Sequence, residues 1–498
     1  MSLPLKDSVT EQNPYFAPVA DALPEASGVQ YRFHFNMTKC IGCHCCEVAC
    51  NEQNNNPASV SWRRVGEIEG GSYPYTQRSY LSMGCNHCLD PACLTGCPVD
   101  AYTKNPSNGL VLHSADACIG CQYCIWNCPY GVPQYNPERG VVGKCDMCYG
   151  RLAEGRDPAC VNACPEEAIT IETVDPAEWR MNYAAFADSP GLPSAEQTIS
   201  TTRVTLPESM PSESRKADYH RVRPEHPHLP LVAMTVLTQL AVGALCCVWL
   251  LEALGRAADW NFASLGALAI GILALGASTL HLGRPIYAYR ALRMWRRSWL
   301  SREVLLFTAF AGMAAIYSGA LRLGLPVSSG LGALTSLLGL GGVAASACIY
   351  LVPARPAWNS RYTVADFFLT AAVLGPVFLS ALGFPLMVFV VAGAGAQLLN
   401  HGLRFLWLIR SDEFELQGSA RLLSADLQNL FLARFALLMA GGVVLPLAGL
   451  HAPALALALA GELFGRYLFF VSVVPRNMAA GFFESASLPV APSGKVAA

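Results

Sequence analysis

The chain has 498 residues and a formal net charge of −2, and only 14% of its residues are charged whereas 53% are hydrophobic. Soluble proteins carry roughly a quarter charged residues, so this deficit indicates membrane-spanning segments. A near-neutral chain lacks the basic surface that binds nucleic acid, and we exclude nucleic acid as a partner.

Residues 1–30 are polar and contain three prolines, and we interpret them as an N-terminal extension. They hold neither the apolar core of a signal peptide nor a twin-arginine pair, so we expect no export signal on this chain. A catalytic partner could carry such a signal for both proteins, which leaves the side of the membrane open at this point.

Sixteen of the twenty cysteines form four groups of four between residues 40 and 164. The first and third groups have the spacing Cys-x2-Cys-x2-Cys-x3-Cys, and the other two stretch the second gap to four and eleven residues. The groups are Cys40, Cys43, Cys46 and Cys50; Cys85, Cys88, Cys93 and Cys97; Cys118, Cys121, Cys124 and Cys128; and Cys145, Cys148, Cys160 and Cys164.

This spacing is typical of bacterial ferredoxins, whose thiolates bind [4Fe–4S] clusters, and the fourth cysteine of each group there ligates the other cluster of its pair. Four quartets therefore predict four [4Fe–4S] clusters. Zinc sites use paired Cys-x-x-Cys knuckles, and disulfides require no such spacing, so both alternatives fit less well. Cys45 breaks the register and Cys46 is the better ligand, whereas Cys246, Cys247 and Cys348 lie in apolar runs as core residues.

The cysteine groups alternate with short strand patterns. Residues 31–36 alternate as a strand, residues 51–84 resemble an inserted hairpin, and residues 111–113 and 169–171 are further short strands. This order predicts an α+β, double-ferredoxin-like iron–sulfur domain over residues 31–175. Residues 176–228 are rich in Pro, Ser, Glu and Arg without periodicity, and we interpret them as a linker lying on the surface.

Residues 229–476 predict an all-α membrane domain of eight transmembrane helices, followed by a polar tail at 477–498. Most apolar runs approach the 20 residues that a helix needs to cross hydrocarbon. The runs cover residues 229–252, 262–282, 303–322, 330–352, 364–383, 385–408, 429–449 and 452–474.

Arginines concentrate on one side of these eight spans. Positive charge favours the cytoplasmic side, so the distribution predicts a multi-pass protein of the inner (cytoplasmic) membrane with the iron–sulfur domain facing the cytoplasm. An alternative is that the arginines bind the iron–sulfur domain itself, whatever the topology. The opposite links hold only Arg256 and Arg322, whereas the domain-side links hold Arg215, Lys216, Arg221, Arg223, Arg284, Arg290, Arg293, Arg296, Arg297, Arg302, Arg355, Arg361, Arg410 and Arg421.

Polar residues in the spans suggest a quinone site, because intramembrane polar groups are costly and usually functional. His281 leads the candidates, since its pKa suits proton exchange and it ends a span on the domain side. Gln239, Glu303, Tyr350 and Arg284 complete the proposed set. The alternative for each is a purely structural polar contact between helices.

Two other membrane chemistries are less well supported. Haem ligation commonly takes two histidines on facing helices, and only His281 and His401 lie in or at the spans, so we expect no haem. Coupled ion transport needs a series of intramembrane carboxylates, of which Glu462 is the clearest. Glu462 and Arg466 lie four residues apart in the last span and could pair on one helix face.

At this point the sequence resembles a known family. Residues 31–175 match the four-cluster electron-transfer subunit of the molybdopterin oxidoreductases of the dimethyl sulfoxide reductase type at all sixteen ligand positions. Cys121 occupies the position at which nitrate reductase relatives carry tryptophan. Residues 229–476 resemble the haem-free, eight-span anchor subunit of the same complexes. The matching pieces are Leu229-Pro230-Leu231, Gln239, His281-Leu282-Gly283, Leu300-Ser301-Arg302-Glu303 and Gly461-Glu462-Leu463-Phe464-Gly465-Arg466.

The resemblance implies a fusion of the two subunits, with the molybdenum catalytic subunit on a separate chain and no catalytic residue here. It implies a quinone, menaquinone or ubiquinone, near His281. It also implies these ligand sets: Cys40, Cys43, Cys46 and Cys164; Cys145, Cys148, Cys160 and Cys50; Cys85, Cys88, Cys93 and Cys128; and Cys118, Cys121, Cys124 and Cys97, the last nearest the membrane.

The link after His281 carries six arginines, more than the dimethyl sulfoxide reductase anchors have there. This favours a relative of the cytoplasmic sulfite-oxidising quinone reductases. Reduction of a sulfoxide with electrons from quinol remains the main alternative, and a hydrogenase partner is a third.

Overall fold

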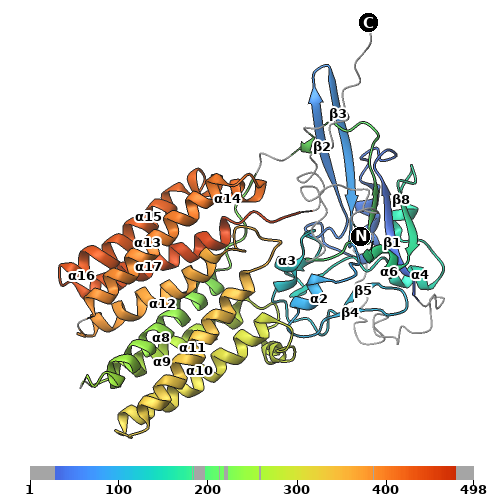
Figure 1. Ribbon diagram of the computed structural model, residues 1–498. Coiled ribbons are helices and arrows are strands. Elements are labelled where there is room, and N and C mark those ends of the chain that lie inside the picture. Colours follow the sequence, from blue (N-terminus) through green and yellow to red (C-terminus); the bar gives the residue numbers. More distant parts are fainter. Residues whose placement is uncertain are drawn as a thin grey trace, which may run out of the picture.

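The computed structural model describes residues 28–181, 183, 197–211, 214–217, 222–256, 259–384 and 386–477. Most of the expected N-terminal extension and almost all of the expected tail lie outside these residues. The described residues form two parts that lie against each other, a small domain rich in strands and a bundle of long helices (Figure 1).

The first sheet of the small domain has β1 (Gln30–Asn36) at its centre. β8 (Ile169–Val174) pairs with it antiparallel and β9 (Arg203–Thr205) pairs with it parallel. Alternation of the residues in β1 places Phe33 and Phe35 in the core. The sheet thus joins the segment that precedes the first cysteine group to the segments that follow the last one.

The second sheet contains the expected inserted hairpin, formed by β2 (Arg64–Ser72) and β3 (Tyr75–Met83). β10 (Arg215–Lys216) pairs with β2. Because β9 and β10 both belong to residues 176–228, this segment is not only a surface linker: its described parts complete both sheets. The remaining strands form two hairpins, β4 (Tyr102–Lys104) with β5 (Val111–His113) and β6 (Gln134–Asn136) with β7 (Val141–Gly143).

Short helices follow the cysteine loops. They are α1 (Cys45–Asn54), α2 (Ala92–Gly96), α3 (Tyr123–Asn127), α4 (Tyr149–Ala153), α5 (Ala159–Asn162) and, after β8, α6 (Pro176–Met181). The loops of the first and third cysteine groups share one backbone conformation. Gly42 and His44 have φ values of 69° and 60°, and Gly120 and Gln122 have φ values of 70° and 61°. These left-handed residues fold each loop tightly, which turns successive cysteines toward one centre.

Seven helical segments are long and apolar enough to cross a membrane. They are α8 (Leu229–Ala253), α9 with the 3₁₀ turn η3 (Asn261–His281), α10 (Trp299–Arg322), α11 (Ser328–Tyr350), α12 (Arg361–Ala381), α15 to α16 (Gln428–Leu447) and α17 (His451–Val471). A π-helical turn, η5 (Ala440–Val444), joins α15 (Gln428–Met439) to α16 (Leu445–Leu447).

The remaining predicted span corresponds to α13 (Met387–Arg410), which is long but carries several polar residues. Gln397, Asn400, His401 and Arg404 recur along one helix face, and all four are buried. They lower the mean hydropathy of the helix, so apolarity alone does not identify α13 as a span. Figure 1 shows α13 beside α15 and α17.

Two shorter segments lie between the long helices. The 3₁₀ helix η4 (Pro285–Leu292) is part of the arginine-rich link between α9 and α10, and α14 (Phe414–Ser424) connects α13 to α15. The helices pack closely where small residues face each other: a Cβ atom added to Gly243 of α8 would lie 2.1 Å from the carbonyl oxygen of Ala371 in α12. Such contacts are typical of helix packing in membranes.

Candidate iron–sulfur centres and their contact with the membrane helices

The sixteen thiols gather in four sets, each with three cysteines from one group and one cysteine from another. Side chains within a set are close enough to interact electrostatically. These are the sets that the family resemblance implies. They are Cys40, Cys43, Cys46 and Cys164 (set one); Cys50, Cys145, Cys148 and Cys160 (set two); Cys85, Cys88, Cys93 and Cys128 (set three); and Cys97, Cys118, Cys121 and Cys124 (set four).

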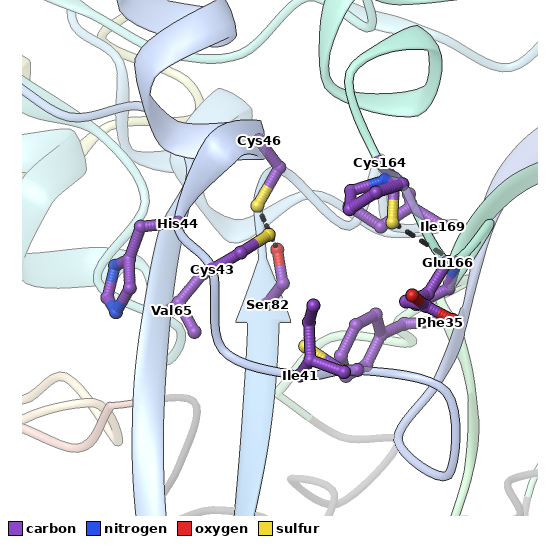
Figure 2. Close-up of a pocket in the computed structure, with 13 residues that line it drawn as sticks. Phe35, Ile41, Cys43, His44, Cys46, Val65, Ser82, Cys164, Glu166 and Ile169 are labelled. Carbon is purple, nitrogen blue, oxygen red and sulfur yellow. Dashed lines mark hydrogen bonds between the residues drawn. The ribbon is translucent and has the colours of Figure 1, made fainter.

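Set one surrounds a cavity of about 330 Å³. Figure 2 shows Cys43, Cys46 and Cys164 around this space, with Ser82 beside Cys46. The hydroxyl of Ser82 lies 3.2 Å from Cys46 Sγ, and the amide of Ala168 donates to Cys164 Sγ at 3.2 Å. Cys45 is exposed and does not line the cavity, so Cys46 is the cysteine of this pair that faces it.

The donors of all four sets fit an iron–sulfur cluster. Each set offers four thiols, and backbone amides donate to the sulfurs of Cys85, Cys97, Cys118 and Cys145 at 3.3–3.5 Å. All twenty cysteines are free. No trio of His, Cys, Asp or Glu in the described residues is arranged to hold a single metal ion, whereas a cubane is coordinated from a wider cage.

Burial gives these thiols a high pKa. Desolvation raises the pKa of Cys148 to about 12, and it raises the pKa values of Cys46 and Cys145 as well. A buried cage of four thiols therefore does not hold four thiolates by itself. It needs a bound cation or cationic cluster to do so, as metal ligation provides.

A buried polar side chain lies between each neighbouring pair of sets, and we call these three the bridging residues. Arg63 faces Cys46 of set one together with Cys145 of set two. Lys144 faces Cys145 of set two together with Cys85 and Cys93 of set three. The third bridging residue is Tyr102, which is near Cys93 of set three and near Cys97 and Cys124 of set four. The four sets thus form one continuous row.

Arg63 is the most unusual of the bridging residues, because it is only 2% exposed and its Nε and Nη2 have no hydrogen-bond partner. Burial by itself lowers the pKa of Arg63, but the nearby thiols outweigh burial and raise it. An isolated guanidinium is very costly to bury, so this position fits anionic groups on both sides. Sequence reasoning missed Arg63, since an arginine in a hairpin region carries no distinguishing signal.

The arginine-rich link attaches the membrane helices to the domain at set four. Arg284 donates to the carbonyl oxygen of Ala115 at 2.9 Å, and its backbone amide donates to that of Ile119 at 3.1 Å. Arg290 donates to the carbonyl oxygen of Asp116 at 2.8 Å. In addition, Arg297 pairs with Asp100 at 3.1 Å, and Ser298 donates to the carbonyl oxygen of Gly96 at 2.7 Å.

Three of the link's six arginines therefore bind the iron–sulfur domain, as the alternative to the topological interpretation stated. This contact depends on glycines. A Cβ atom on Gly283 would lie 2.1 Å from the carbonyl oxygen of Gly140, and one on Gly120 would lie 2.9 Å from the Cα of Gly283. Side chains at these positions would push the two parts of the molecule apart.

An aromatic cluster continues from set four into the helices. Trp126, two residues after Cys124, is 5% exposed, and its ring centroid lies 5.7 Å from that of Tyr350 and 5.4 Å from that of Trp358. Trp358 stacks on Phe469 at 5.2 Å. The fourth thiol set is therefore separated from the helix interior only by packed side chains, with no solvent layer.

The five residues predicted for a quinone site do not all lie together. Glu303 and Tyr350 are buried and close to each other, and both are near Tyr123 of the iron–sulfur domain. His281 contacts the carbonyl oxygen of Ser278 through Nδ1. By contrast, Arg284 is occupied at the domain interface, and Gln239 accepts a hydrogen bond from Arg466 at 2.9 Å.

His228, which sequence reasoning did not select, lies beside His281 at the start of α8. Its ring centroid is 5.4 Å from that of Trp126. Burial lowers the pKa of His228 to about 4, with smaller contributions from His226, His281 and Arg355. His228 is therefore neutral at physiological pH and links His281 to the aromatic cluster.

Gln239 belongs to a second group, which we call the buried polar cluster. Arg466 Nη1 lies 3.6 Å from Asp366, which also pairs with Arg434 at 3.2 Å. The cluster consists of Gln239, Asp366, Gln397, His401, Arg404, Arg434, Glu462 and Arg466. Glu462 accepts from Thr370 at 2.8 Å, so the carboxylate that pairs with Arg466 is Asp366. Both Asp366 and Arg434 went unnoticed in the sequence, although each is a charged residue in an apolar run.

Comparisons with known proteins agree with this geometry. Residues 76–174 match the family model of the 4Fe-4S dicluster domain, and residues 224–393 match that of the DMSO reductase anchor subunit (DmsC). One of the proteins of the anaerobic dimethyl sulfoxide reductase of Escherichia coli (strain K12) is 41% identical over 177 residues, which cover 34% of this chain and 85% of that protein.

Two further relatives are similar. The corresponding protein of the anaerobic dimethyl sulfoxide reductase of Haemophilus influenzae is 39% identical over 178 residues, again 34% of this chain and 85% of the relative. A subunit of the sulfite dehydrogenase of Allochromatium vinosum is 35% identical over 154 residues, 27% of this chain and 64% of the relative. This protein belongs to the dimethyl sulfoxide reductase family, in which it is a fusion of the iron–sulfur subunit and the membrane-anchor subunit.

Proposed function

We propose that this protein carries electrons between a separate molybdopterin-containing catalytic subunit and membrane quinone. The observation that carries the proposal is the continuous row of four thiol sets that ends at the aromatic cluster of the membrane helices. The names of its relatives support the catalytic partner, because they are subunits of dimethyl sulfoxide reductase and of sulfite dehydrogenase.

Four [4Fe–4S] clusters, one in each thiol set of a double-ferredoxin-like domain, would supply the electron conduction when bound. This chain's own residues contribute the thiolate ligands, the amide hydrogen bonds to sulfur and the buried cations Arg63 and Lys144. Packing excludes water between the sets: His87, Tyr102 and Met147 are each 2% exposed or less. We assign residues 30–175, extended by β9 and β10, to this domain and residues 229–476 to the anchor.

Eight spans are proposed for the anchor, with α13 as the eighth. Its 24 residues suffice to cross the hydrocarbon, and its polar face is buried against other helices. An even number of spans places both ends of the anchor on one side. We place that side in the cytoplasm and the helices in the inner membrane, with Arg293, Arg296, Arg302, Arg361, Arg410 and Arg421 as the positive charges on that side. Reporter fusions at the link between α10 and α11 test this, and a cytoplasmic signal there would contradict it.

The quinone head group is proposed to bind where Glu303, Tyr350 and His281 approach set four. Glu303 can hold a proton on a carboxylate oxygen, Tyr350 can donate a hydrogen bond from Oη, and Trp126 fills the space toward Cys124. No haem is assigned to this chain, and the site takes either menaquinone or ubiquinone.

A matched pair of variants tests the quinone site. His281→Ala is expected to leave iron content unchanged and to reduce electron exchange with a soluble quinone analogue by about tenfold or more, the loss expected for one critical hydrogen bond to a reacting group. His451→Ala removes a histidine at the start of α17, far along the chain from this site, and is expected to change neither. Wild-type quinone turnover in His281→Ala would remove His281 from the site.

For the substrate of the partner we propose sulfite, with reduction of a sulfoxide as the alternative that the dimethyl sulfoxide reductase relatives favour. Because three arginines of the link bind the iron–sulfur domain, the argument from topology rests on the remaining ones. The purified complex should contain molybdenum and reduce quinone when sulfite is added. Quinol oxidation by a sulfoxide without any response to sulfite would reverse this choice, and nickel in place of molybdenum would indicate a hydrogenase.

A further inference from the structure

A pocket of about 330 Å³ opens in the membrane part, away from His281 and Glu303. Three helices supply its polar wall and its rim: His401 and Arg404 come from α13, Arg434 from α15 and Phe469 from α17. Phe405 and Phe431 line it as well, with ring centroids 4.9 Å apart. The pocket therefore combines a charged inner wall with apolar sides.

The polar groups in its wall lack partners. His401 is 3% exposed, and neither of its ring nitrogens has a hydrogen-bond partner; its nearest acid, Asp366, is 3.6 Å away. The Nε atoms of Arg404 and Arg434 are also buried without partners. Since buried donors in proteins are nearly always satisfied, these groups point to a ligand that accepts hydrogen bonds.

The charge around the pocket is unbalanced. Arg434 and Arg466 both pair with Asp366, whereas no carboxylate lies within ion-pair distance of Arg404 in the described part of the chain. Arg404 donates only to the carbonyl oxygen of Ala357, at 3.1 Å. Three arginines thus share two carboxylates, Asp366 and Glu462, and the side facing the pocket is positive. A neutral quinone would not compensate this charge, but an anion would.

The depth of the pocket matches the head-group region of a bilayer. Ser472, at the end of α17, lines it, as does Leu423 of α14. Arg404 lies six residues before the end of α13, which is about 9 Å at the rise of an α-helix. The charged wall is therefore within reach of a lipid phosphate, and the phenylalanines continue toward the region of the acyl chains.

We propose that this pocket binds the phosphate head group of an anionic membrane phospholipid. Arg404 and Arg434 neutralise the phosphate, His401 donates a hydrogen bond to it, and the lipid joins α13 to α15 and α17. The proposal is independent of the quinone site and of the partner's substrate.

The test uses the full complex, purified in detergent and stripped of lipid, to which phosphatidylglycerol, phosphatidylcholine or inorganic phosphate is added. The amount of lipid bound per protein molecule and the midpoint of thermal unfolding are measured. Phosphatidylglycerol is expected to bind and raise the midpoint, and the two others are not. Arg404→Gln should weaken phosphatidylglycerol binding about tenfold, the value of one charge-assisted hydrogen bond, and Arg404→Lys should largely restore it.

Arg410→Gln is the matched control, because Arg410 is an exposed arginine at the same end of the same helix; it should bind lipid like the wild type. Ser472→Phe narrows the pocket without changing its charges and should also weaken binding, which covers the case in which Arg404→Gln does not fold. Equal binding of phosphatidylglycerol to wild type, Arg404→Gln and Ser472→Phe would overturn the proposal. So would a response to inorganic phosphate alone, or loss of quinone binding instead of lipid binding.

Discussion

Arg63 offers the sharpest test of the row of thiol sets. Its guanidinium is buried between sets one and two and faces Cys46, Cys50, Cys145 and Cys160. Each electron added to a cluster adds one negative charge near this cation. For a separation of about 7 Å and an effective dielectric constant of about 20, the interaction is about 2 kcal/mol, or about 100 mV for one electron.

Arg63→Met should therefore lower the midpoint potentials of two clusters by several tens of millivolts up to about 100 mV, and leave those of sets three and four nearly unchanged. Redox titration of the anaerobically purified complex, followed by electron paramagnetic resonance, measures this directly. Arg63→Lys keeps the charge and should keep most of both potentials.

The matched control is Arg78→Gln, because Arg78 is an arginine in the same hairpin but lies on the surface, 54% exposed, beside Glu69. Solvent screens its charge, so no potential should change. Iron content must remain that of the wild type for the comparison to hold. Unchanged potentials in iron-replete Arg63→Met, or equal shifts of all four clusters, would refute the reasoning.

Three other perturbations test the interface and the ligands. Gly283→Val places a side chain against the carbonyl oxygen of Gly140 and should expose the domain interface to proteases with the iron content intact, whereas Gly276→Val, which meets no neighbouring atom, should not. Cys121→Ser should alter one of the four cluster signals and slow transfer to quinone; four unaltered signals would exclude it as a ligand. The folded-state pKa of His228, about 4, lies below the unfolded value of about 6.5, so the unfolded protein takes up protons first and stability should fall as the pH drops from 6.5 to 4. His228→Gln should flatten this slope in thermal unfolding, and an unchanged slope would show that His228 does not cause it.

The cysteine loops could be predicted from the sequence because their chemistry is local. Spacings of two and three residues on a tight loop fix which thiols face one centre, and Gly42 and Gly120 provide the left-handed turns that this requires. The apolar runs predicted the long helices for a similar reason, since length and hydropathy are properties of each segment alone.

Other features depend on contacts between distant segments. Arg284 resembled a ligand-binding residue but binds Ala115, because the helices dock on the iron–sulfur domain through this link. β9 and β10 lie in an irregular segment, and only their pairing with β1 and β2 makes them strands. α13 carries polar residues that would disfavour a span, yet they are buried against partners from α12, α15 and α17.

The sequence by itself determined the sixteen thiols, the four-group pattern and the hydrophobic helices, because each of these is encoded in residue spacing along one segment. Only the tertiary structure decided that Arg63 and Lys144 lie between the sets, that Trp126 meets Tyr350, and that Asp366 is shared by two arginines. Burial and charge neighbours arise from segments far apart in the sequence, and no local pattern records which of them meet.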